Sequence, residues 1–162
     1  MSDSKPAGGR VEVGDAAPDF TLPDQSGQQV SLRDVLARGP VVLYFYPKDE
    51  TPGCTAEACA FRDAYEVFRE AGAEVVGVSS DGVGSHERFA SRHQLPFTLV
   101  ADADGAVRKR YGVRRTLGVL PGRVTYVIDG GGVVRHVFSS QMGVTRHVQE
   151  ALDALNEITA RA

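Results

Sequence analysis

Two patterns of hydrophobic residues alternate along this chain: short continuous apolar runs, and stripes in which apolar residues recur every three or four positions. Continuous runs rich in β-branched and aromatic residues are typical of buried strands. They predict strands at 41–46, 74–79, 97–101, 124–128 and 133–138. The helical stripes predict helices from Cys54 to about Ala71, at 85–93, at 106–111 and along the C-terminal segment that contains Val148, Leu152, Leu155 and Ile158.

Turn residues mark the ends of several of these elements. Gly72 and Pro96 each follow a predicted helix and stop it. The segment 129–132, Asp-Gly-Gly-Gly, lies between two β-branched runs and predicts a hairpin. Before the first buried strand, the prolines within 13–23 predict an extended lead-in that pairs briefly as a short strand, and Ser31 is expected to cap a short helix.

The order of these elements predicts the fold class. With the lead-in and the inserted segment 97–117 set aside, the order is strand, helix, strand, helix, strand, strand, helix. Helical crossovers imply parallel neighbouring strands, and the hairpin adds an antiparallel edge. We therefore expect an α/β protein with a thioredoxin-like fold, in which a central mixed β-sheet is flanked by helices and carries an N-terminal extension and an inserted strand-helix segment. Residues 1–10 are expected to form a flexible polar tail and residues 11–162 a single domain.

Composition narrows the class of function. A net charge of −3 gives no reason to expect nucleic acid or an anionic membrane as a partner. No run reaches the roughly 18 apolar residues of a membrane span. The N-terminal residues lack the apolar core of a signal peptide, so we expect a cytoplasmic location. In that reducing compartment, two cysteines are more often reactive than structural.

The candidate chemistry lies in the stretch 44–59, which contains both cysteines of the protein. If Thr51 is the N-cap of the helix that follows, Pro52 takes the first helical position and Cys54 the third. The unpaired N–H groups and the dipole of a helix start favour a negative charge there, and the thiolate is the nucleophilic form of cysteine. We expect Cys54 to be an activated nucleophile. The alternative is a small, buried and inert cysteine, but the Thr-Pro-Gly lead-in and the second thiol argue against it.

The second thiol, Cys59, could fill the core or could resolve an oxidised Cys54 by forming a disulfide. In an intact helix, five residues correspond to a rise of ~7.5 Å and a rotation of ~140°, which separates the two Cα atoms by ~8.6 Å. A disulfide needs Cα atoms about 4.4–6.8 Å apart. The resolving role therefore requires the first turns of this helix to unwind after oxidation, and the reduced form should hold two separate thiols.

Paired cysteines also occur in zinc sites and in dithiol oxidoreductases. A zinc site needs about four ligands at close spacing. The histidines are scattered singly and are expected at the surface or at helix ends: His86, His93, His136 and His147. A dithiol oxidoreductase of the thioredoxin type has Cys-x-x-Cys, which this chain lacks. We therefore expect no metal ion.

The stretch closely resembles the peroxiredoxin signature Pro-x-x-x-Thr-x-x-Cys, which is met by Pro47, Thr51 and Cys54. The longer pattern Pro-Lys-Asp-x-Thr-Pro-Gly-Cys-Thr-x-Glu-Ala-Cys resembles the peroxiredoxin Q group, also called bacterioferritin comigratory protein, in which a resolving cysteine follows five residues after the peroxidatic one. The similarity extends from about residue 11 to the C-terminal helix and includes 15–24 and 123–129.

The resemblance implies a thiol peroxidase that reduces hydrogen peroxide or organic hydroperoxides, in antioxidant defence and redox homeostasis. Cys54 would become a sulfenic acid, Cys59 would form the Cys54–Cys59 disulfide, and thioredoxin or a glutaredoxin-like dithiol would reduce it. The resemblance also implies a monomer without a cofactor. By the same resemblance, Thr51 would bond the peroxide and the sulfur, Arg123 would hold the peroxide oxygens and stabilise the thiolate, and Pro47 would shield the sulfur from water.

Some matched positions allow a plainer interpretation. Glu57 belongs to the motif, but a solvated acid in the first helical turn is an equally good description. Arg62 is more often found in a surface ion pair than beside a sulfur. The loop Arg114–Gly122 is shorter than in many members of the family it resembles, which leaves substrate size and oligomeric state open. A redox sensor that uses the same two thiols to signal, rather than to turn over, shares the first chemical step and is not separated from an enzyme by the sequence.

Overall fold

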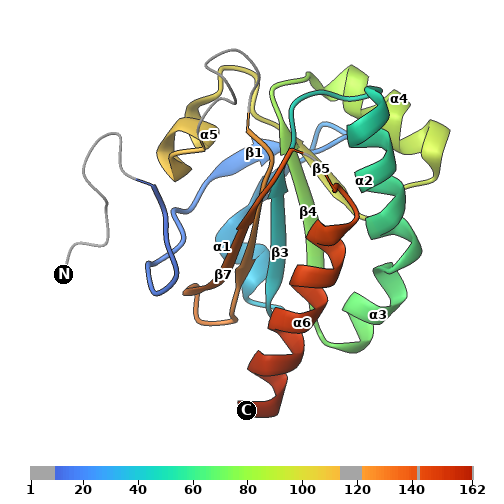
Figure 1. Ribbon diagram of the computed structural model, residues 1–162. Helices are drawn as coiled ribbons and strands as arrows, with labels where there is room; N and C mark the ends of the chain where they lie inside the picture. Colours follow the sequence, from blue (N-terminus) through green and yellow to red (C-terminus); the bar gives the residue numbers. More distant parts are fainter. Residues whose placement is uncertain (1–9, 114–121, 142, 162) are drawn as a thin grey trace.

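A mixed five-stranded β-sheet forms the centre of the molecule (Figure 1). The computed structural model describes residues 10–113, 122–141 and 143–161. The strands lie in the order β5-β4-β3-β6-β7. The β3–β4 and β4–β5 pairs are parallel, and the β3–β6 and β6–β7 pairs are antiparallel. This confirms the predicted thioredoxin-like α/β fold with a mixed sheet. The strands are β3 (Val41–Phe45), β4 (Glu74–Ser79), β5 (Thr98–Ala101), β6 (Val124–Ile128) and β7 (Val134–Ser139).

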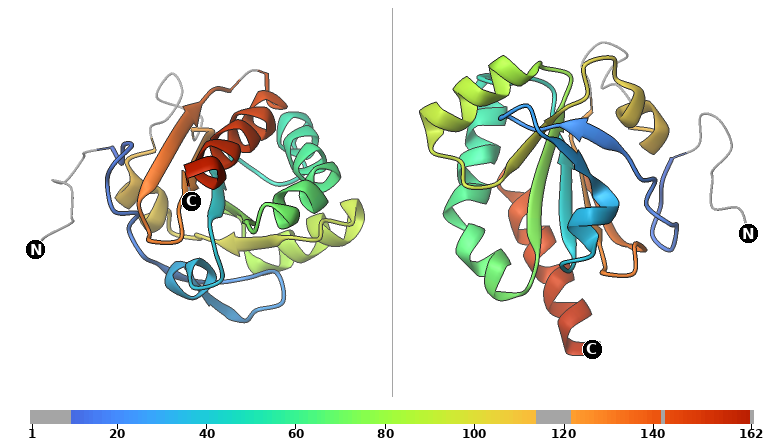
Figure 2. Two further views of the ribbon diagram at one scale, coloured as in Figure 1. Left: turned by 90° about the horizontal axis from the view of Figure 1, so that it is seen from below. Right: turned by 180° about the vertical axis from the view of Figure 1, so that it is seen from behind.

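Helices cover both faces of this sheet, and alternate residues of β3 face the two layers. Val42 and Tyr44 belong to one buried cluster, which includes residues of α2, α3, α4 and α6. Val41, Leu43 and Phe45 belong to a second cluster, on the side of α1 and α5. Figure 2 shows α6 and α2 on one side of the sheet and α1 on the other. The helices are α1 (Leu32–Leu36), α2 (Pro52–Asp63), α3 (Tyr65–Glu70), α4 (Val83–His93), α5 (Ala106–Tyr111) and α6 (Arg146–Arg161).

The N-terminal extension contributes a small antiparallel pair, β1 (Thr21–Pro23) and β2 (Gln29–Ser31), joined by a turn in which the Gly27 N–H donates to the Asp24 carbonyl. Ser31 caps α1 as expected, because its Oγ accepts a hydrogen bond from the Asp34 N–H at 3.1 Å. The inserted strand and helix of the prediction are β5 and α5. The predicted tail at 1–10 and the loop Arg114–Gly122 lie almost wholly outside the described residues.

The structure departs from the predicted boundaries at two helices. The helix expected to run from Cys54 to about Ala71 is divided at Ala64, which leaves the helical region with φ −95° and ψ 1°. Ser85 does not cap α4, since that helix begins at Val83 and the Ser85 hydroxyl instead donates to Asp49 Oδ2 at 2.8 Å. Strand ends differ by one residue at most.

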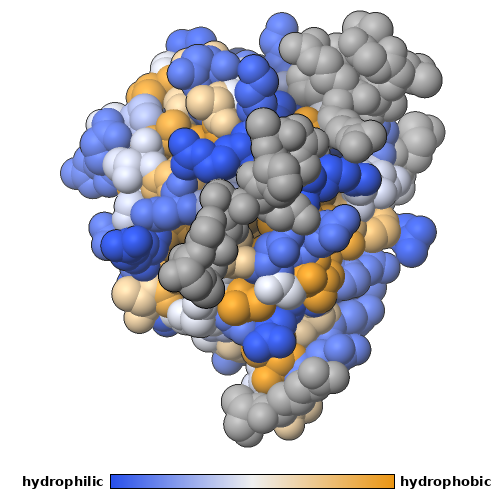
Figure 3. Space-filling view, turned by 90° about the vertical axis from the view of Figure 1, so that its left-hand side faces the viewer, coloured by the Kyte–Doolittle hydropathy of each residue, from blue (hydrophilic) through white to orange (hydrophobic). Residues whose placement is uncertain are grey.

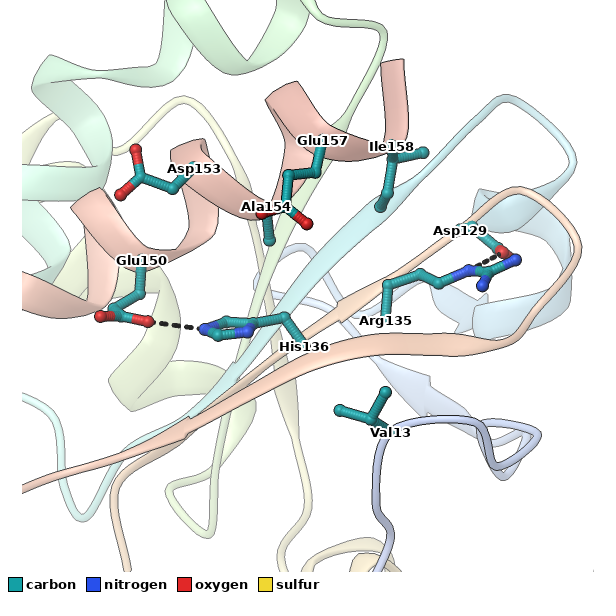
Figure 4. Close-up of a pocket in the computed structure, with 9 residues that line it drawn as sticks. All are labelled: Val13, Asp129, Arg135, His136, Glu150, Asp153, Ala154, Glu157 and Ile158. Atoms are coloured by element: carbon teal, nitrogen blue, oxygen red, sulfur yellow. Dashed lines mark hydrogen bonds and ion pairs between the residues drawn. The ribbon is translucent and has the colours of Figure 1, made fainter. Parts of the chain in front are cut away.

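The surface mixes hydrophilic and apolar residues (Figure 3). On the face shown in Figure 3, apolar side chains lie in small areas separated by hydrophilic ones. None of the helices in the described part of the chain combines the length and the apolar character that crossing a bilayer requires. A hollow of about 610 Å³ lies between β7 and α6, lined by residues such as His136, Glu150 and Ile158 (Figure 4). Neither cysteine lines it, so the predicted chemistry lies elsewhere.

Candidate active site

Cys54 lies in the first turn of α2, directly after the loop that follows β3. Thr51 is the N-cap residue with extended backbone (φ −77°, ψ 152°), Pro52 is the first helical residue and Cys54 the third, as predicted. The thiol is buried, with 1% of the residue exposed. The sulfur is therefore shielded from water at a helix start, where unpaired backbone N–H groups and the helix dipole favour an anion.

Thr51 caps this helix through its backbone only. Its side chain makes no capping hydrogen bond, and Oγ1 instead donates to the carbonyl of Lys48 at 2.9 Å. Thr51 is therefore the N-cap residue, as expected, but its hydroxyl is engaged within the preceding loop. Pro47 is half-buried and follows Tyr46, whose carbonyl oxygen accepts a hydrogen bond from Arg108 Nη2 at 2.8 Å.

Arg123 reaches this helix from the residue just before β6. Its Nη2 donates to Cys54 Sγ at 3.4 Å, and its Nη1 donates to Glu57 Oε1 at 2.5 Å. Burial opposes the charge of this guanidinium, but Glu57 and Cys54 outweigh burial and raise the pKa of Arg123 above its ordinary value. Gly53 leaves the room for this approach, since a Cβ at that position would lie 3.1 Å from Nη2.

Glu57 is fully buried and is the sixth residue of α2, beyond the first turn, which corrects the description of a solvated first-turn acid. The face of α2 that carries Glu57 is turned toward the sheet, and the carboxyl meets Arg123 there. Burial raises the pKa of Glu57 to about 8, although Arg123 acts in the opposite direction. Within the described residues, Oε2 has no hydrogen-bond partner and lies 3.6 Å from His147 Nδ1.

His147, near the start of α6, is the residue of this site that sequence reasoning missed. It is buried: Nε2 faces the Ser140 carbonyl at 2.8 Å, and Nδ1 lies 2.7 Å from Thr125 Oγ1. Burial lowers the pKa of this imidazole to about 4, so the ring is neutral at pH 7. The sequence did contain a signal for its burial, because His147 precedes the buried Ala151 and Leu155 by four and eight residues and so lies on the same face of the helix.

His86 also contradicts the expectation of surface or capping histidines. It lies fully buried beneath the loop that precedes α2. Its Nε2 faces the Val100 carbonyl at 2.9 Å, which only accepts, and its Nδ1 lies 2.7 Å from Asp49 Oδ2. The Asp49 carboxyl also accepts from the hydroxyls of Tyr46 and Ser85, so this histidine belongs to a buried hydrogen-bond network.

Asp49, Asp81 and His86 each offer a ligand atom within 4.8 Å of the others, and could together hold a metal ion. The same atoms are already engaged with one another and with the loop. Asp81 Oδ2 accepts from the Asp49 N–H at 2.7 Å and from the Ser79 hydroxyl at 2.6 Å. The arrangement therefore acts as a buried polar network that fixes residues 46–49 ahead of α2.

Cys59 is half-buried, and both thiols are free. The helix α2 runs through Cys54 and Cys59 without a break, which is the condition under which the two Cα atoms are too far apart for a disulfide. Arg62 lies in the expected surface ion pair, with Nε 3.0 Å from Asp63 Oδ1, and it also donates to the His93 carbonyl at 2.8 Å.

The chain has clear relatives among known proteins. The sequence model of the AhpC/TSA family matches residues 13–137. The chloroplastic peroxiredoxin Q of Arabidopsis thaliana is 54% identical over 147 residues, which cover 90% of this chain and 68% of that protein. Peroxidoxin BcpB from Mycobacterium tuberculosis matches with a TM-score of 0.86 at 43% identity, over 92% of this chain and 99% of that one. The bacterioferritin comigratory protein of Xanthomonas campestris, studied for its alkyl peroxide reduction activity, matches with a TM-score of 0.81 at 34% identity, over 92% and 98%.

These relatives overturn one expectation and decide the family. This comparison contradicts the expected cytoplasmic location, because plant relatives that are 52% and 54% identical in sequence are chloroplastic proteins. The family match includes both cysteines and Arg123. The chain belongs to the AhpC/TSA family and, within it, to the peroxiredoxin Q group.

Proposed function

We propose that Cys54 is the peroxidatic cysteine of this thiol peroxidase and that Cys59 is its resolving cysteine. One observation carries the proposal: Cys54 Sγ is buried in the first turn of α2 and lies 3.4 Å from Arg123 Nη2. A helix start and a guanidinium both favour the thiolate, which is the form that attacks peroxides. The spacing of Cys59 on the same helix supports its role in the second step.

The proposed reaction has three steps. The Cys54 thiolate attacks the terminal oxygen of the hydroperoxide, the O–O bond breaks, and the leaving oxygen takes a proton to become an alcohol, or water from hydrogen peroxide. Cys54 is left as a sulfenic acid. The thiolate of Cys59 then attacks that sulfur, an S–S bond forms as the S–O bond breaks, and the leaving hydroxide takes a proton to become water. A dithiol donor finally transfers two electrons and two protons to the disulfide, which restores both thiols.

The surrounding residues take complementary parts in the first step. Arg123 presents several donors from a planar fork, which suits it to hold the peroxide and to stabilise the negative charge that develops on the leaving oxygen. The Thr51 hydroxyl donates to Lys48 but keeps lone pairs, so its oxygen is able to accept the proton of a bound peroxide. Pro47 shields the sulfur side of the loop from water.

The substrate class and partners follow from the same group. We propose that organic hydroperoxides are reduced as well as hydrogen peroxide, which the alkyl peroxide activity of the Xanthomonas relative supports. Thioredoxin or a glutaredoxin-like dithiol would serve as reductant, and the protein would act as a monomer in antioxidant defence. Gel filtration that returns the mass of one 17.3 kDa chain would agree with the monomer.

Peroxide-dependent consumption of NADPH, coupled through thioredoxin and its reductase, tests the proposal. The wild-type protein should turn over, Cys54→Ser should not, and Cys59→Ser should be oxidised once without sustained turnover. Mass spectrometry after one equivalent of peroxide should show a loss of two hydrogens that links Cys54 to Cys59. Full turnover by either variant, or no turnover by the wild-type protein, would contradict these roles.

A further inference from the structure

The carboxyl group of Glu57 is buried with its two oxygens in different hydrogen-bonding environments. Oε1 accepts a hydrogen bond from Arg123, whereas Oε2 has no hydrogen-bond partner within the described residues. His147 Nδ1 lies 3.6 Å from Oε2. Nε2 of that ring donates to the Ser140 carbonyl, which leaves Nδ1 to accept from the Thr125 hydroxyl. Oε2 therefore faces a lone pair and not a donor, an arrangement that favours a protonated carboxyl.

The other ionisable groups around Glu57 do not change this balance. Arg123, the residue before β6, is a cation that faces Glu57, and it is shared with Cys54 of the same helix. Tyr44 from β3 presents a buried hydroxyl without a hydrogen-bond partner among the described residues. Burial first, and then Glu57 and Cys54, raise the pKa of Tyr44 well above its ordinary value, so this phenol stays neutral. His147 from α6 is neutral as well.

Glu57 also lies inside the segment that must change for the second step of the reaction. Residues 55–58 form the whole covalent link between the two cysteines. An intact helix holds the cysteine Cα atoms ~8.6 Å apart, and a disulfide needs them within about 6.8 Å, so the backbone between them must unwind. A carboxyl that is completely buried and fixed by Arg123 cannot keep its place while its own backbone unwinds.

We propose that Glu57 is a proton-dependent latch on disulfide formation: protonated and buried against Arg123 and His147 it holds α2 wound, and it releases its proton to water when the segment 54–59 unwinds. The inference rests on the proposed function, because it assigns a control to the resolving step of that reaction. It makes Glu57 a positioning residue, which acts on the cysteines through the conformation of α2.

The sign of the pH dependence follows from the two environments. In the wound form, burial raises the pKa of Glu57 to about 8, and in the unwound form the carboxyl returns to its solvated value of about 4.3. The stabilisation of the wound form is complete below about pH 4.3 and declines by about tenfold per pH unit between about pH 4.3 and 8. Forming the disulfide in this window should release one proton more than the thiols alone release.

The ratio of disulfide to dithiol, measured by mass spectrometry in buffers of a dithiol and its disulfide between pH 5.5 and 7.5, tests the latch. Across these two pH units, the ratio for the wild-type protein should shift toward the disulfide about 100-fold more than the ratio for Glu57→Gln, about 60 mV in potential. Glu66→Gln is the matched control, because Glu66 is exposed and lies outside the unwinding segment, and it should behave as the wild-type protein. Thiolate absorbance, titrated in each protein, accounts for protons that come from Cys54.

A second measurement needs no variant. Difference infrared spectra of the wild-type protein at pH 6.5 should show the carbonyl band of a protonated carboxylic acid in the reduced state, lost on oxidation. The same pH slope in wild type and Glu57→Gln, or no such band, would overturn the latch. If peroxide formed no Cys54–Cys59 disulfide at all, the proposed function itself would fail, an outcome that the same mass spectra distinguish.

Discussion

Replacing Arg123 by lysine keeps a positive charge in the site but removes the forked guanidinium that ties the start of β6 to α2. Nη1 and Nη2 of the guanidinium donate to Glu57 Oε1 at 2.5 Å and to Cys54 Sγ at 3.4 Å. A lysine ammonium is a single point charge on a flexible stem, and it does not reproduce two parallel, oriented donors. We therefore expect Arg123→Lys to fold but to hold the sulfur and the leaving oxygen poorly.

The size of the effect can be worked from these two contacts. A hydrogen bond to a charged group contributes about 1.5–3 kcal/mol, and loss of a donor to a developing oxyanion slows a reaction by about 10²–10³-fold. Because lysine retains the charge, the lower end applies, and the second-order rate constant for oxidation of Cys54 should fall by about 100-fold. A loss of about 1 kcal/mol of folding free energy would lower the melting temperature by about 2–4 °C.

Competition with a haem peroxidase for hydrogen peroxide measures the rate constant, in a Cys59→Ser background that isolates the first oxidation. Arg33→Lys is the matched control, because the Arg33 side chain is 84% exposed and its only described ion pair, with Asp19, spans 4.0 Å. It should leave the rate constant unchanged. A rate constant for Arg123→Lys equal to that of the wild-type protein would refute the role of the fork.

Three further substitutions test the packing around the site. Asp49→Asn should lower the free energy of unfolding by about 1–3 kcal/mol, since an amide nitrogen cannot accept a hydrogen bond and either the Tyr46 or the Ser85 hydroxyl then loses its acceptor; urea denaturation measures this loss, with the exposed Asp63→Asn as control. In the same assay Gly77→Ala should cost about 1–3 kcal/mol, because its Cβ would lie 2.9 Å from neighbouring core side chains. Gly53→Ala should slow peroxide oxidation of Cys54 while the melting temperature stays nearly constant, since the new Cβ presses on Arg123 Nη2.

The thiol part of the site could be predicted because its determinants are local. A strand that ends at a proline, a Thr-Pro-Gly turn and a helix start lie within a short stretch, and backbone chemistry alone places Cys54 at the third helical position. The separation of Cys54 and Cys59 along one helix is equally local. The sheet order was predictable for a related reason, because crossover and hairpin rules link neighbouring elements.

The remaining parts of the site depend on contacts between segments that are distant in sequence. Arg123 was placed by family resemblance, and no pattern around β6 shows that its side chain reaches α2. The burial of His147 requires α6 to pack against β6 and β7, and that of His86 requires the loop before α2 to close over α4. Local rules assign single histidines to surfaces, because the donors and acceptors that satisfy them in a core are supplied by other elements.

Glu57 shows how helical periodicity decides whether a side chain is buried. It is the sixth residue of α2, beyond the first turn in which the helix dipole favours acids. Cys54, Glu57, Ala58 and Phe61 are the buried residues of α2, at the spacing i, i+3, i+4 and i+7. A carboxyl in the middle of a core stripe must find a cation or a proton, and in this fold Arg123 supplies the first and the burial favours the second. An acid on the apolar face of a helix is therefore better interpreted as a functional group than as a solvated one.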